Sequence, residues 1–485
     1  MEGVSEKKIE RCPFLSTINR NLLDFDYEKI CSLTLREENV YCCLVCGLNY
    51  HGRGKDSVAY KHSLEMNHHL FINLENSNIY CLPNNYEIVE HSLEDIKNYL
   101  HPCFNINGDY KKLYNASKTF DKIEYLPGYI GISNFGNNDS LNVILLLLSQ
   151  ITNFRNMCIE YNLYDEFVEN RISDPFIFNM IESIKKIYSP FNLKGKYSPY
   201  TLASIIEKKS QGKFNFSKLS SNKVSRNKVE IIDPMALLSW IIFQLKKKLK
   251  RYLNNSFQKK YSPEIEVNES SNGDKNNKFD LISSCIQGEL YSGSSKNVIN
   301  NKKLNKNDNA ENCNIYFNCI TLQLPPIIET KMSTFNNNNN TRVNSNLTPQ
   351  IPIYKLLDSK FFSSTNSLLI WKLPCYLIIH IGRFTKSTLN IEKNKTLVSF
   401  PLVDLDLSAY LHPDAIKMNP NTKYNLINNI SHKNYLERSK FVSQLLHPYR
   451  DEWIEIEDLN VQTVLPQAII LNESYLLLYK RSDLL

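Results

Sequence analysis

Residues 43–69 read CLVCGLNYHGRGKDSVAYKHSLEMNHH, and two cysteines and two histidines follow one another in them at C-x2-C-x15-H-x5-H spacing. Two thiolates and two imidazoles form a complete tetrahedral ligand set for Zn2+, and a site closed by four protein ligands is structural rather than catalytic. The spacing therefore predicts one structural Zn2+ on Cys43, Cys46, His62 and His68. His69 is the alternative fourth ligand.

Cysteine is concentrated around this segment, since six of the twelve cysteines lie in residues 1–81. This asymmetry predicts a separate small domain at about residues 10–105. Residues 1–11 are charged and lead into no apolar stretch, so we expect no secretory signal and a reducing compartment, where clustered cysteines usually bind metal. Cys12, Cys31 and His51 could hold a second metal. Because they lack a clear fourth ligand, we favour buried or free side chains for these three.

Length and charge limit the other possibilities. A chain of 485 residues predicts two to four domains at roughly 100–200 residues each. The longest apolar run, Val143–Leu148, is far too short for a spanning helix, so we expect no membrane segment. The net charge of +7 is a mild excess, which permits a polyanionic partner without indicating one.

The remaining sequence predicts a polar connector at 106–124 and one large α+β domain at 125–483. Apolar spacing predicts helices at 141–151 and 234–250, and alternating or continuous apolar runs predict strands at 375–381, 424–430, 453–456 and 475–479. Segments near 253–313 and 333–349 are rich in Asn, Ser and Lys, so we expect disordered insertions there.

Several motifs resemble known families. Residues 43–69 resemble the zinc-finger ubiquitin-binding domain, and the large domain resembles the papain-like fold of the ubiquitin-specific proteases. The second resemblance rests on YLPGYIGISNFGNND at 125–139, LPCYLIIHIGRF at 373–384, WIEIED at 453–458 and SYLLLYKR at 474–481.

The zinc-finger resemblance implies the same four zinc ligands that the spacing predicts. Relatives with several zincs carry a cysteine where this chain has His51 and a histidine where it has Val58, so the resemblance implies that the extra zinc sites are lost. Arg53 matches the arginine that meets the free ubiquitin C-terminus, whereas Tyr41 replaces a tryptophan. Ubiquitin binding therefore stays open.

The protease resemblance places Asp139 at the position of the nucleophilic cysteine and Lys440 at that of the general base. Asp458 and Asn134 keep the positions of the orienting residue and the oxyanion donor. A carboxylate is a poor nucleophile towards an amide, and a lysine is charged at pH 7 and cannot accept a proton. The resemblance therefore implies a protein without protease activity, in which Asp139 starts a helix and forms an ion pair with Lys440. His432 lies eight residues too early to replace the base.

Within that family, this chain is most similar to an inactive branch that works in the spliceosomal tri-snRNP, through stretches such as CPFLSTINRNLLDFDYEKICS at 12–32, YCLPNNYEIVEHSLEDI at 80–96 and VLPQAIILNESYL at 464–476. This likeness implies a nuclear, non-catalytic scaffold that binds tri-snRNP proteins and supports pre-mRNA splicing. The alternative is a ubiquitin-binding protein or residual deubiquitinase. Basic residues end the 234–251 helix; a solvated helix terminus explains them, and contact with snRNA phosphates is the other reading.

Overall fold

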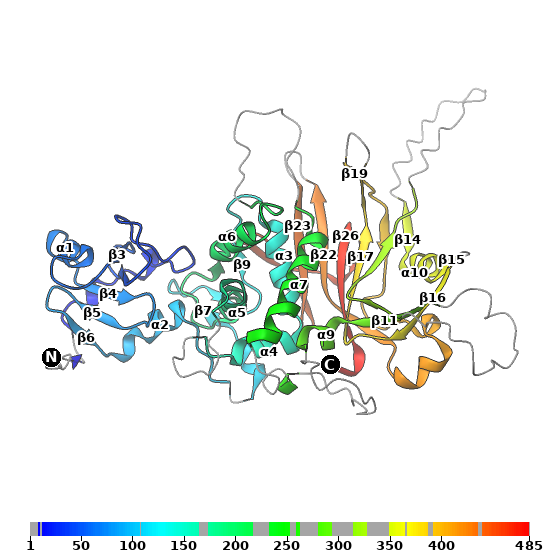
Figure 1. Ribbon diagram of the computed structural model, residues 1–485, viewed down its shortest axis with the longest axis horizontal. Coiled ribbons are helices and arrows are strands. Elements are labelled where there is room, and N and C mark those ends of the chain that lie inside the picture. Colours follow the sequence, from blue (N-terminus) through cyan, green and yellow to red (C-terminus); the bar gives the residue numbers. More distant parts are fainter. Residues whose placement is uncertain are drawn as a thin grey trace, which may run out of the picture. The chain divides into compact units, whose positions relative to one another are not determined.

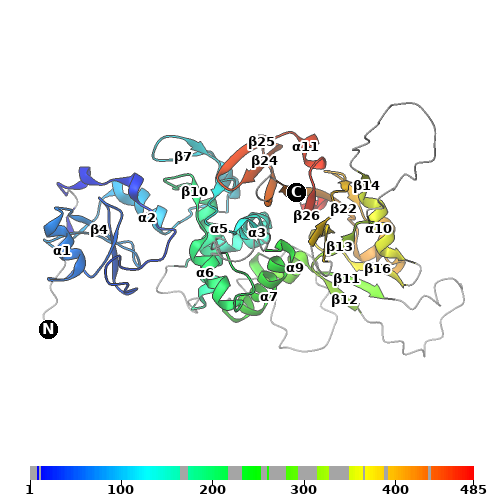
Figure 2. The same cartoon turned by 90° about the horizontal axis from the view of Figure 1, so that it is seen from above.

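The computed structural model describes residues 8–9, 12–106, 108–163, 173–216, 232–252, 259–261, 280–292, 314–326, 349–363, 366–386, 391–434 and 439–484. The chain divides into two compact units. The first unit comprises 1–237, 251–254 and 456–461, and the second comprises 238–250, 255–455 and 462–485. Many elements of both units are labelled in Figures 1 and 2.

A six-stranded sheet opens the first unit, as far as its residues are described. Its strand order is β1-β6-β5-β4-β2-β3, and only the β1–β6 pair is parallel. The strands are β1 (Lys8–Ile9), β2 (Val40–Cys43), β3 (Asn49–His51), β4 (Leu70–Asn73), β5 (Ile79–Cys81) and β6 (Tyr86–Ile88). The helices of this part are α1 (Val58–Glu65) and α2 (Glu94–Leu100).

Strand β2 is buried on both faces. Val40 and Cys42 belong to one apolar cluster of the sheet, and Tyr41 and Cys43 belong to another. Successive side chains of a strand point to opposite faces, which explains this division. Cys42 therefore points away from the side of Cys43, as a packing residue would.

Helices make up most of the rest of the first unit. Those after the sheet are α3 (Asp139–Ser149), α4 (Thr152–Glu160), α5 (Pro175–Tyr188) and α6 (Tyr200–Lys209). Every residue of α3 is buried, as expected of a helix that is apolar on all sides. Asp174 caps α5 by accepting from the N–H groups of Phe176 and Ile177, and Pro175 occupies its first position. Short strand pairs complete this part, namely β7 (Ser117–Lys118) with β8 (Glu124–Tyr125) and β9 (Gly131–Ile132) with β10 (Lys196–Tyr197).

The second unit is built on a large sheet of order β13-β17-β26-β22-β23-β24-β25, with β21 pairing beside β22. These strands are β13 (Ile320–Gln323), β17 (Tyr376–Gly382), β21 (Leu405–Asp406), β22 (Lys423–Asn434), β23 (Ser439–His447), β24 (Glu452–Glu457), β25 (Asn460–Val464) and β26 (Ser474–Arg481). Strand β26 lies between β17 and β22 (Figure 1), and its apolar run 475–479 is fully buried. The predicted strands of this region are confirmed.

Smaller elements surround this sheet. A second sheet has the order β12-β11-β16-β15, and two further pairs are β14–β20 and β18–β19. The strands are β11 (Gly288–Ser292), β12 (Asn314–Phe317), β14 (Gln350–Pro352), β15 (Phe362–Ser363), β16 (Asn366–Lys372), β18 (Phe384–Lys386), β19 (Ile391–Lys393) and β20 (Leu397–Ser399). The helices are α7 (Pro234–Tyr252), α9 (Leu281–Ile286), α10 (Ile353–Phe361) and α11 (Pro466–Ile470). Helix α7 confirms the predicted helix at 234–250.

One expected insertion differs from the structure. Residues 280–292 lie inside the predicted insertion 253–313, but they form α9 and β11, and Leu281, Ile282 and Cys285 are fully buried. The prediction is wrong for this part, because the polar composition around it hid a short apolar helix. Most of the remainder, and the insertion at 333–349 apart from its last residue, lies outside the described residues.

The expected boundary at 106–124 lies inside the first unit. Lys186 on α5 donates to Asp26 Oδ1 at 2.8 Å, and Lys194 donates to Asp24 Oδ2 at 2.9 Å. These ion pairs join the segment between β1 and β2 to the helical part of the same unit. The limits 10–105, 106–124 and 125–483 stay predictions. Among the described helices, each is too short or too polar to cross a membrane.

Candidate functional site

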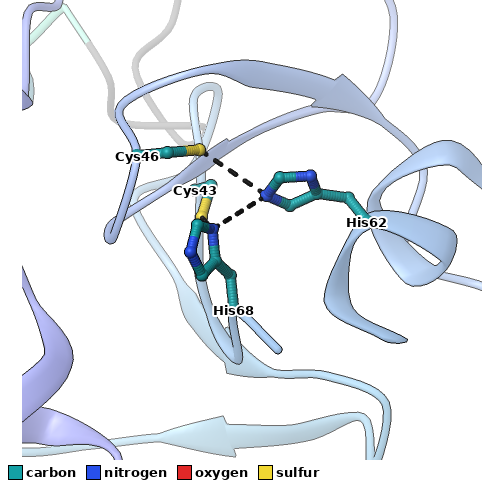
Figure 3. Close-up of side chains that lie close together, drawn as sticks. All are labelled: Cys43, Cys46, His62 and His68. Carbon is teal, nitrogen blue, oxygen red and sulfur yellow. Dashed lines mark hydrogen bonds between the residues drawn. The ribbon is translucent and has the colours of Figure 1, made fainter. Parts of the chain in front are cut away.

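The four predicted zinc ligands lie together in the first unit. Cys43 Sγ is 3.6 Å from His68 Nδ1, and Cys46 Sγ is 3.5 Å from His62 Nε2. The two histidine nitrogens are 3.1 Å apart (Figure 3), and all four ligand atoms lie within 4.8 Å of one another. Within the described part of the chain, this is the one group of three or more such side chains that could hold a metal.

These distances match the edges of a tetrahedral zinc site. With Zn–S at about 2.3 Å and Zn–N at about 2.05 Å, tetrahedral angles place a sulfur and a nitrogen about 3.5 Å apart and two nitrogens about 3.3 Å apart. The hydrogen bond between the two sulfurs lowers the pKa of Cys46 to about 4 and raises that of Cys43. Zinc would bind both sulfurs as thiolates, and their protons would be released on binding.

Local folding explains how the ligands meet. Cys43 ends β2, and the chain turns through Gly47, which has a φ of +76° and whose N–H donates to Cys43 O at 2.8 Å. A Cβ atom at Gly47 would lie 2.4 Å from Leu22 O, so only glycine fits this turn. Helix α1 carries His62, whose ring stacks on Tyr50 at 4.2 Å between centroids.

The other candidate metal ligands do not join this group. The side chain of His69 contacts Leu82 O at 2.8 Å and Asn67 Oδ1 at 2.8 Å, so His68 and not His69 completes the cluster. Cys12 Sγ lies 3.2 Å from the hydroxyl of Tyr86, and Cys31 Sγ accepts from the N–H of Thr34 at 3.4 Å. A second metal on Cys12, Cys31 and His51 therefore finds no support among the described residues.

Arg53, which the zinc-finger resemblance assigns to the ubiquitin tail, contacts two neighbours. Its guanidinium donates to Asn85 Oδ1 at 2.6 Å and lies over the ring of Tyr80 at 4.1 Å. The Tyr80 ring in turn meets Tyr41 edge-on at 6.1 Å. The cation of Arg53 is thus held in place by an aromatic ring and an amide.

Asp139, which the protease resemblance places at the position of the nucleophile, lies at the start of α3 in the first unit. The helix begins at Asp139, which is 6% exposed, and Asn138 is its N-cap. The Asn138 amide donates to Ser133 O and to Asn142 Oδ1, both at 2.9 Å, and accepts from the N–H of Phe135. Asn134 accepts from the N–H of Gly136 at 3.3 Å. This loop is ordered by its own asparagines, with the Asp139 carboxylate in the first turn, where a negative charge is favoured.

Asp458 also belongs to the first unit. Its backbone carbonyl accepts from the N–H of Ile132 at 2.8 Å, and it has a φ of 52°. The next residue, Leu459, passes so close to Gly131 that a Cβ there would lie 2.9 Å from its Cα. The segment around Asp458 is therefore fixed against β9.

Lys440 lies in the second unit, on β23, directly opposite Lys433 of β22. Lys433 donates to Glu455 Oε1 at 2.6 Å, and the buried Glu455 also accepts from Gln444 at 2.7 Å and from Gln462 at 3.1 Å. Burial alone would raise the pKa of Glu455, but the hydrogen bonds from Lys433 and Gln444 lower it. No local pattern in the sequence marks this network, because Lys433, Gln444 and Glu455 lie in three different strands.

His432 is buried in β22, and neither of its ring nitrogens has a hydrogen-bond partner among the described residues. The ring lies between Phe384 and Phe441, at 5.2 and 4.8 Å between centroids. Burial, with Lys393 and Arg383 nearby, lowers the pKa of His432 to about 3. The ring is therefore a very weak base, which agrees with its exclusion from the base position.

This depressed pKa gives a prediction for stability against pH. A histidine that stays neutral in the folded protein makes its full contribution to the free energy of unfolding at pH values above its pKa in the unfolded chain, about 6.5. This contribution is lost as the pH falls from 6.5 towards 3. Between pH 7 and pH 4.5, the free energy of unfolding should fall less in His432→Phe than in the wild type. The difference should reach up to about 2–3 kcal/mol, because each pH unit below 6.5 is worth about 1.36 kcal/mol. Urea denaturation at both pH values measures this difference, and equal pH dependence in the two proteins contradicts it.

Comparison with known proteins agrees with this geometry. The model of the "Ubiquitin carboxyl-terminal hydrolase" family matches residues 130–479, and that of the "Zn-finger in ubiquitin-hydrolases and other protein" family matches residues 31–93. The chain belongs to the ubiquitin carboxyl-terminal hydrolase family, with an N-terminal zinc-finger domain of the type found in ubiquitin hydrolases. The expected fold, a small zinc-finger domain followed by a ubiquitin-specific-protease domain, is confirmed.

Relatives match over nearly the whole chain. Human "Ubiquitin carboxyl-terminal hydrolase 39" is 31% identical over 99% of this chain and 81% of its own length. The "Probable mRNA-splicing protein ubp10" of Schizosaccharomyces pombe is 30% identical over 97% of this chain and 88% of its own. The "Pre-mRNA-splicing factor SAD1" of Saccharomyces cerevisiae is 28% identical over 97% of this chain and 93% of its own.

A solved structure shows the same arrangement. The "Crystal structure of an essential yeast splicing factor" matches with a TM-score of 0.70 and 26% identity, over 97% of this chain and 99% of that chain. Both the zinc-finger domain and the protease-like domain are therefore shared with a splicing factor. The likeness to a branch of this family that works in splicing, predicted from the sequence, is confirmed by the names of these relatives.

Proposed function

We propose that this protein is a non-catalytic assembly factor of the spliceosome, which binds proteins of the tri-snRNP in the nucleus and supports pre-mRNA splicing. The observation that carries the proposal is similarity over the full chain, through both domains in the same order, to proteins named as splicing factors. The proposed partners are proteins of the tri-snRNP, with contact to the snRNA backbone as a further candidate.

Co-purification tests this proposal. Tagged full-length chain, recovered from nuclear extract of its own source cells, should enrich tri-snRNP proteins together with the U4, U5 and U6 RNAs. Tag alone is the control. Enrichment of ubiquitin conjugates without tri-snRNP components would contradict the proposal and favour the ubiquitin-binding alternative.

The protein's lack of protease activity is part of the same proposal. By resemblance, Asp139 occupies the position of the nucleophile and Lys440 that of the general base. The loss of either catalytic group nearly abolishes activity in enzymes of this kind. Asn134 and Asp458, at the oxyanion and orienting positions, are retained.

A ubiquitin–fluorophore substrate measures any remaining activity. The wild-type chain should give no turnover above buffer. Turnover that disappears in Asp139→Ala would overturn the non-catalytic assignment. The double variant Asp139→Cys/Lys440→His then asks whether the cleft survives: hydrolysis means that ubiquitin still docks, and its absence means that docking has been lost as well.

The metal assignment is one structural Zn2+ on Cys43, Cys46, His62 and His68. The tetrahedral spacing of the four ligand atoms and the match to a zinc-finger family support it. Zinc would cross-link the segments of the finger that carry the four ligands. Because all four ligands come from the protein, the metal would have no open coordination position for catalysis. Elemental analysis should find one zinc per chain.

Binding of a free ubiquitin tail is the second candidate function, because Arg53 keeps the position that meets the terminal carboxylate in relatives. Its guanidinium already contacts Asn85 and Tyr80. Titration of the chain with intact ubiquitin is compared with titration with ubiquitin that lacks its last two glycines. Binding of the intact form alone would mean that Arg53 leaves Asn85 and contacts the terminal carboxylate.

A further inference from the structure

Four exposed leucines lie near one another on the zinc finger, beside the cysteine turn. Leu22 is 52% exposed, Leu33 72%, Leu35 70% and Leu48 51%. The backbone of Leu22 lies close to Gly47, the residue before Leu48, and Ser32, the residue before Leu33, donates its N–H to Asn49 O at 2.8 Å. Backbone neighbours thus connect all four positions, which we call the leucine edge. Exposed apolar clusters on a soluble surface mark sites of interaction more often than scattered single residues do.

The loop at 31–36 holds two of these leucines in a strained conformation. Leu35 has a φ of 55°, in the left-handed region that a leucine rarely adopts. Its N–H donates to Cys31 O at 3.0 Å, and the N–H of Cys31 donates to Arg36 O at 2.9 Å, which closes the loop. Leu35 thus combines a strained backbone with an exposed apolar side chain, and such strain is commonly found at functional sites.

The same loop restricts how a partner could bind. Strand β3 is the last strand of the six-stranded sheet in the described chain, so its outer edge could in principle pair with an added strand. That edge is covered, because Asn49 O accepts from Ser32 and the N–H of His51 approaches the sulfur of Cys31. A partner therefore has to contact leucine side chains rather than the backbone. An amphipathic helix, with apolar residues at i, i+3, i+4 and i+7, does this.

The charges around the leucine edge indicate the polar face of that helix. Glu28, Glu37 and Glu38 are exposed, and Arg36 is the one exposed cation between residues 28 and 38. Lys29, the other cation of this stretch, turns inward and lies 3.5 Å from His101. The stretch that carries Leu33 and Leu35 thus exposes more acidic than basic side chains, although the chain as a whole carries +7.

We propose that the leucine edge is a docking surface for a basic amphipathic helix of a partner protein. The leucines bury its apolar face, and Glu28, Glu37 and Glu38 attract its lysines and arginines. The strained loop at 31–36 already holds Leu33 and Leu35 at the surface before a partner binds. Binding therefore costs little conformational entropy at these two residues.

A designed peptide tests the proposal on the full-length chain. The probe is a fluorescent helix of about 18 residues, long enough to form in water, with leucines on one face and lysines on the other. One comparison peptide replaces the lysines by glutamate, and another shuffles the sequence. Fluorescence anisotropy should show binding of the basic peptide alone, and added NaCl should weaken it.

Variants locate the site. Leu33→Ser and Leu35→Asn should each weaken binding about tenfold or more, because each leucine buries apolar surface in the complex. Asparagine tolerates a positive φ, so Leu35→Asn should melt no lower than the wild type, which separates lost binding from lost folding. Glu37→Lys with Glu38→Lys should weaken the basic peptide and strengthen the acidic one. Leu471→Gln, at a leucine 66% exposed in the second unit, is the matched control and should bind as the wild type does.

Three results would overturn the proposal. The first is the absence of binding by the wild type, or binding that Leu33→Ser and Leu35→Asn leave unchanged. The second is equal affinity for the acidic peptide, which would remove the role of the glutamates. The third is self-association in sedimentation that Leu35→Asn abolishes, because the leucine edge would then bind a second copy of this chain.

Discussion

Cys43→Ser is expected to release the zinc and to unfold the finger of the first unit. In small zinc sites the metal-binding free energy is also folding free energy, about 10–16 kcal/mol in isolated zinc-finger peptides. Cys43 ends β2, which pairs with both β3 and β4, and contacts His68, so its loss removes a ligand and the cross-link together. Hydrogen exchange should show lost protection for β2 to β5, with the strands of the second unit still protected.

Cys103→Ser is the control for this experiment. Cys103 is exposed and lies outside the metal cluster. This variant should keep one zinc per chain and the protection pattern of the wild type. A Cys43→Ser protein that retains zinc, or a finger that stays protected without it, would show that the four residues are not a structural metal site.

Lys186→Met is expected to have the second largest effect, through the buried ion pair with Asp26. Both side chains are below 10% exposed, and Lys186 Nζ also donates to Phe25 O at 3.0 Å. Burial raises the pKa of Asp26, and Lys186 offsets this only in part. Removing one partner of such a pair leaves a buried charge and costs about 3–5 kcal/mol. The free energy of unfolding of the first unit, followed by urea denaturation, should fall by that amount.

Two further variants make this test specific. Asp26→Asn in the Lys186→Met background removes the uncompensated charge and keeps an acceptor for the N–H of Ser198, so it should recover part of the loss. Lys118→Met breaks an exposed pair with Glu124 and should cost only about 0–1 kcal/mol. A Lys186→Met protein as stable as Lys118→Met would show that Asp26 and Lys186 do not join the two parts of the first unit.

The sequence alone predicted the zinc ligands, because a C-x2-C turn and two histidines in 26 residues leave little choice of geometry. It also predicted α3 and α7 from their apolar spacing, and β17, β22, β24 and β26 from their apolar runs, since local periodicity reports which face is buried. The degenerate positions Asn134, Asp139, Lys440 and Asp458 came from resemblance to a family, and their mutual geometry stays a prediction.

Only the tertiary structure revealed the pair of Asp26 and Lys186, which are 160 residues apart, and the acceptance of three hydrogen bonds by the buried Glu455. It also showed that α9 and β11 interrupt a polar segment, and that a strained loop places Leu33 and Leu35 on the surface beside β3. Local patterns carry information about neighbours along the chain. Buried polar pairs and exposed apolar clusters depend instead on which distant segments the fold brings together, because the energy of a charge or a leucine is set by its surroundings in space.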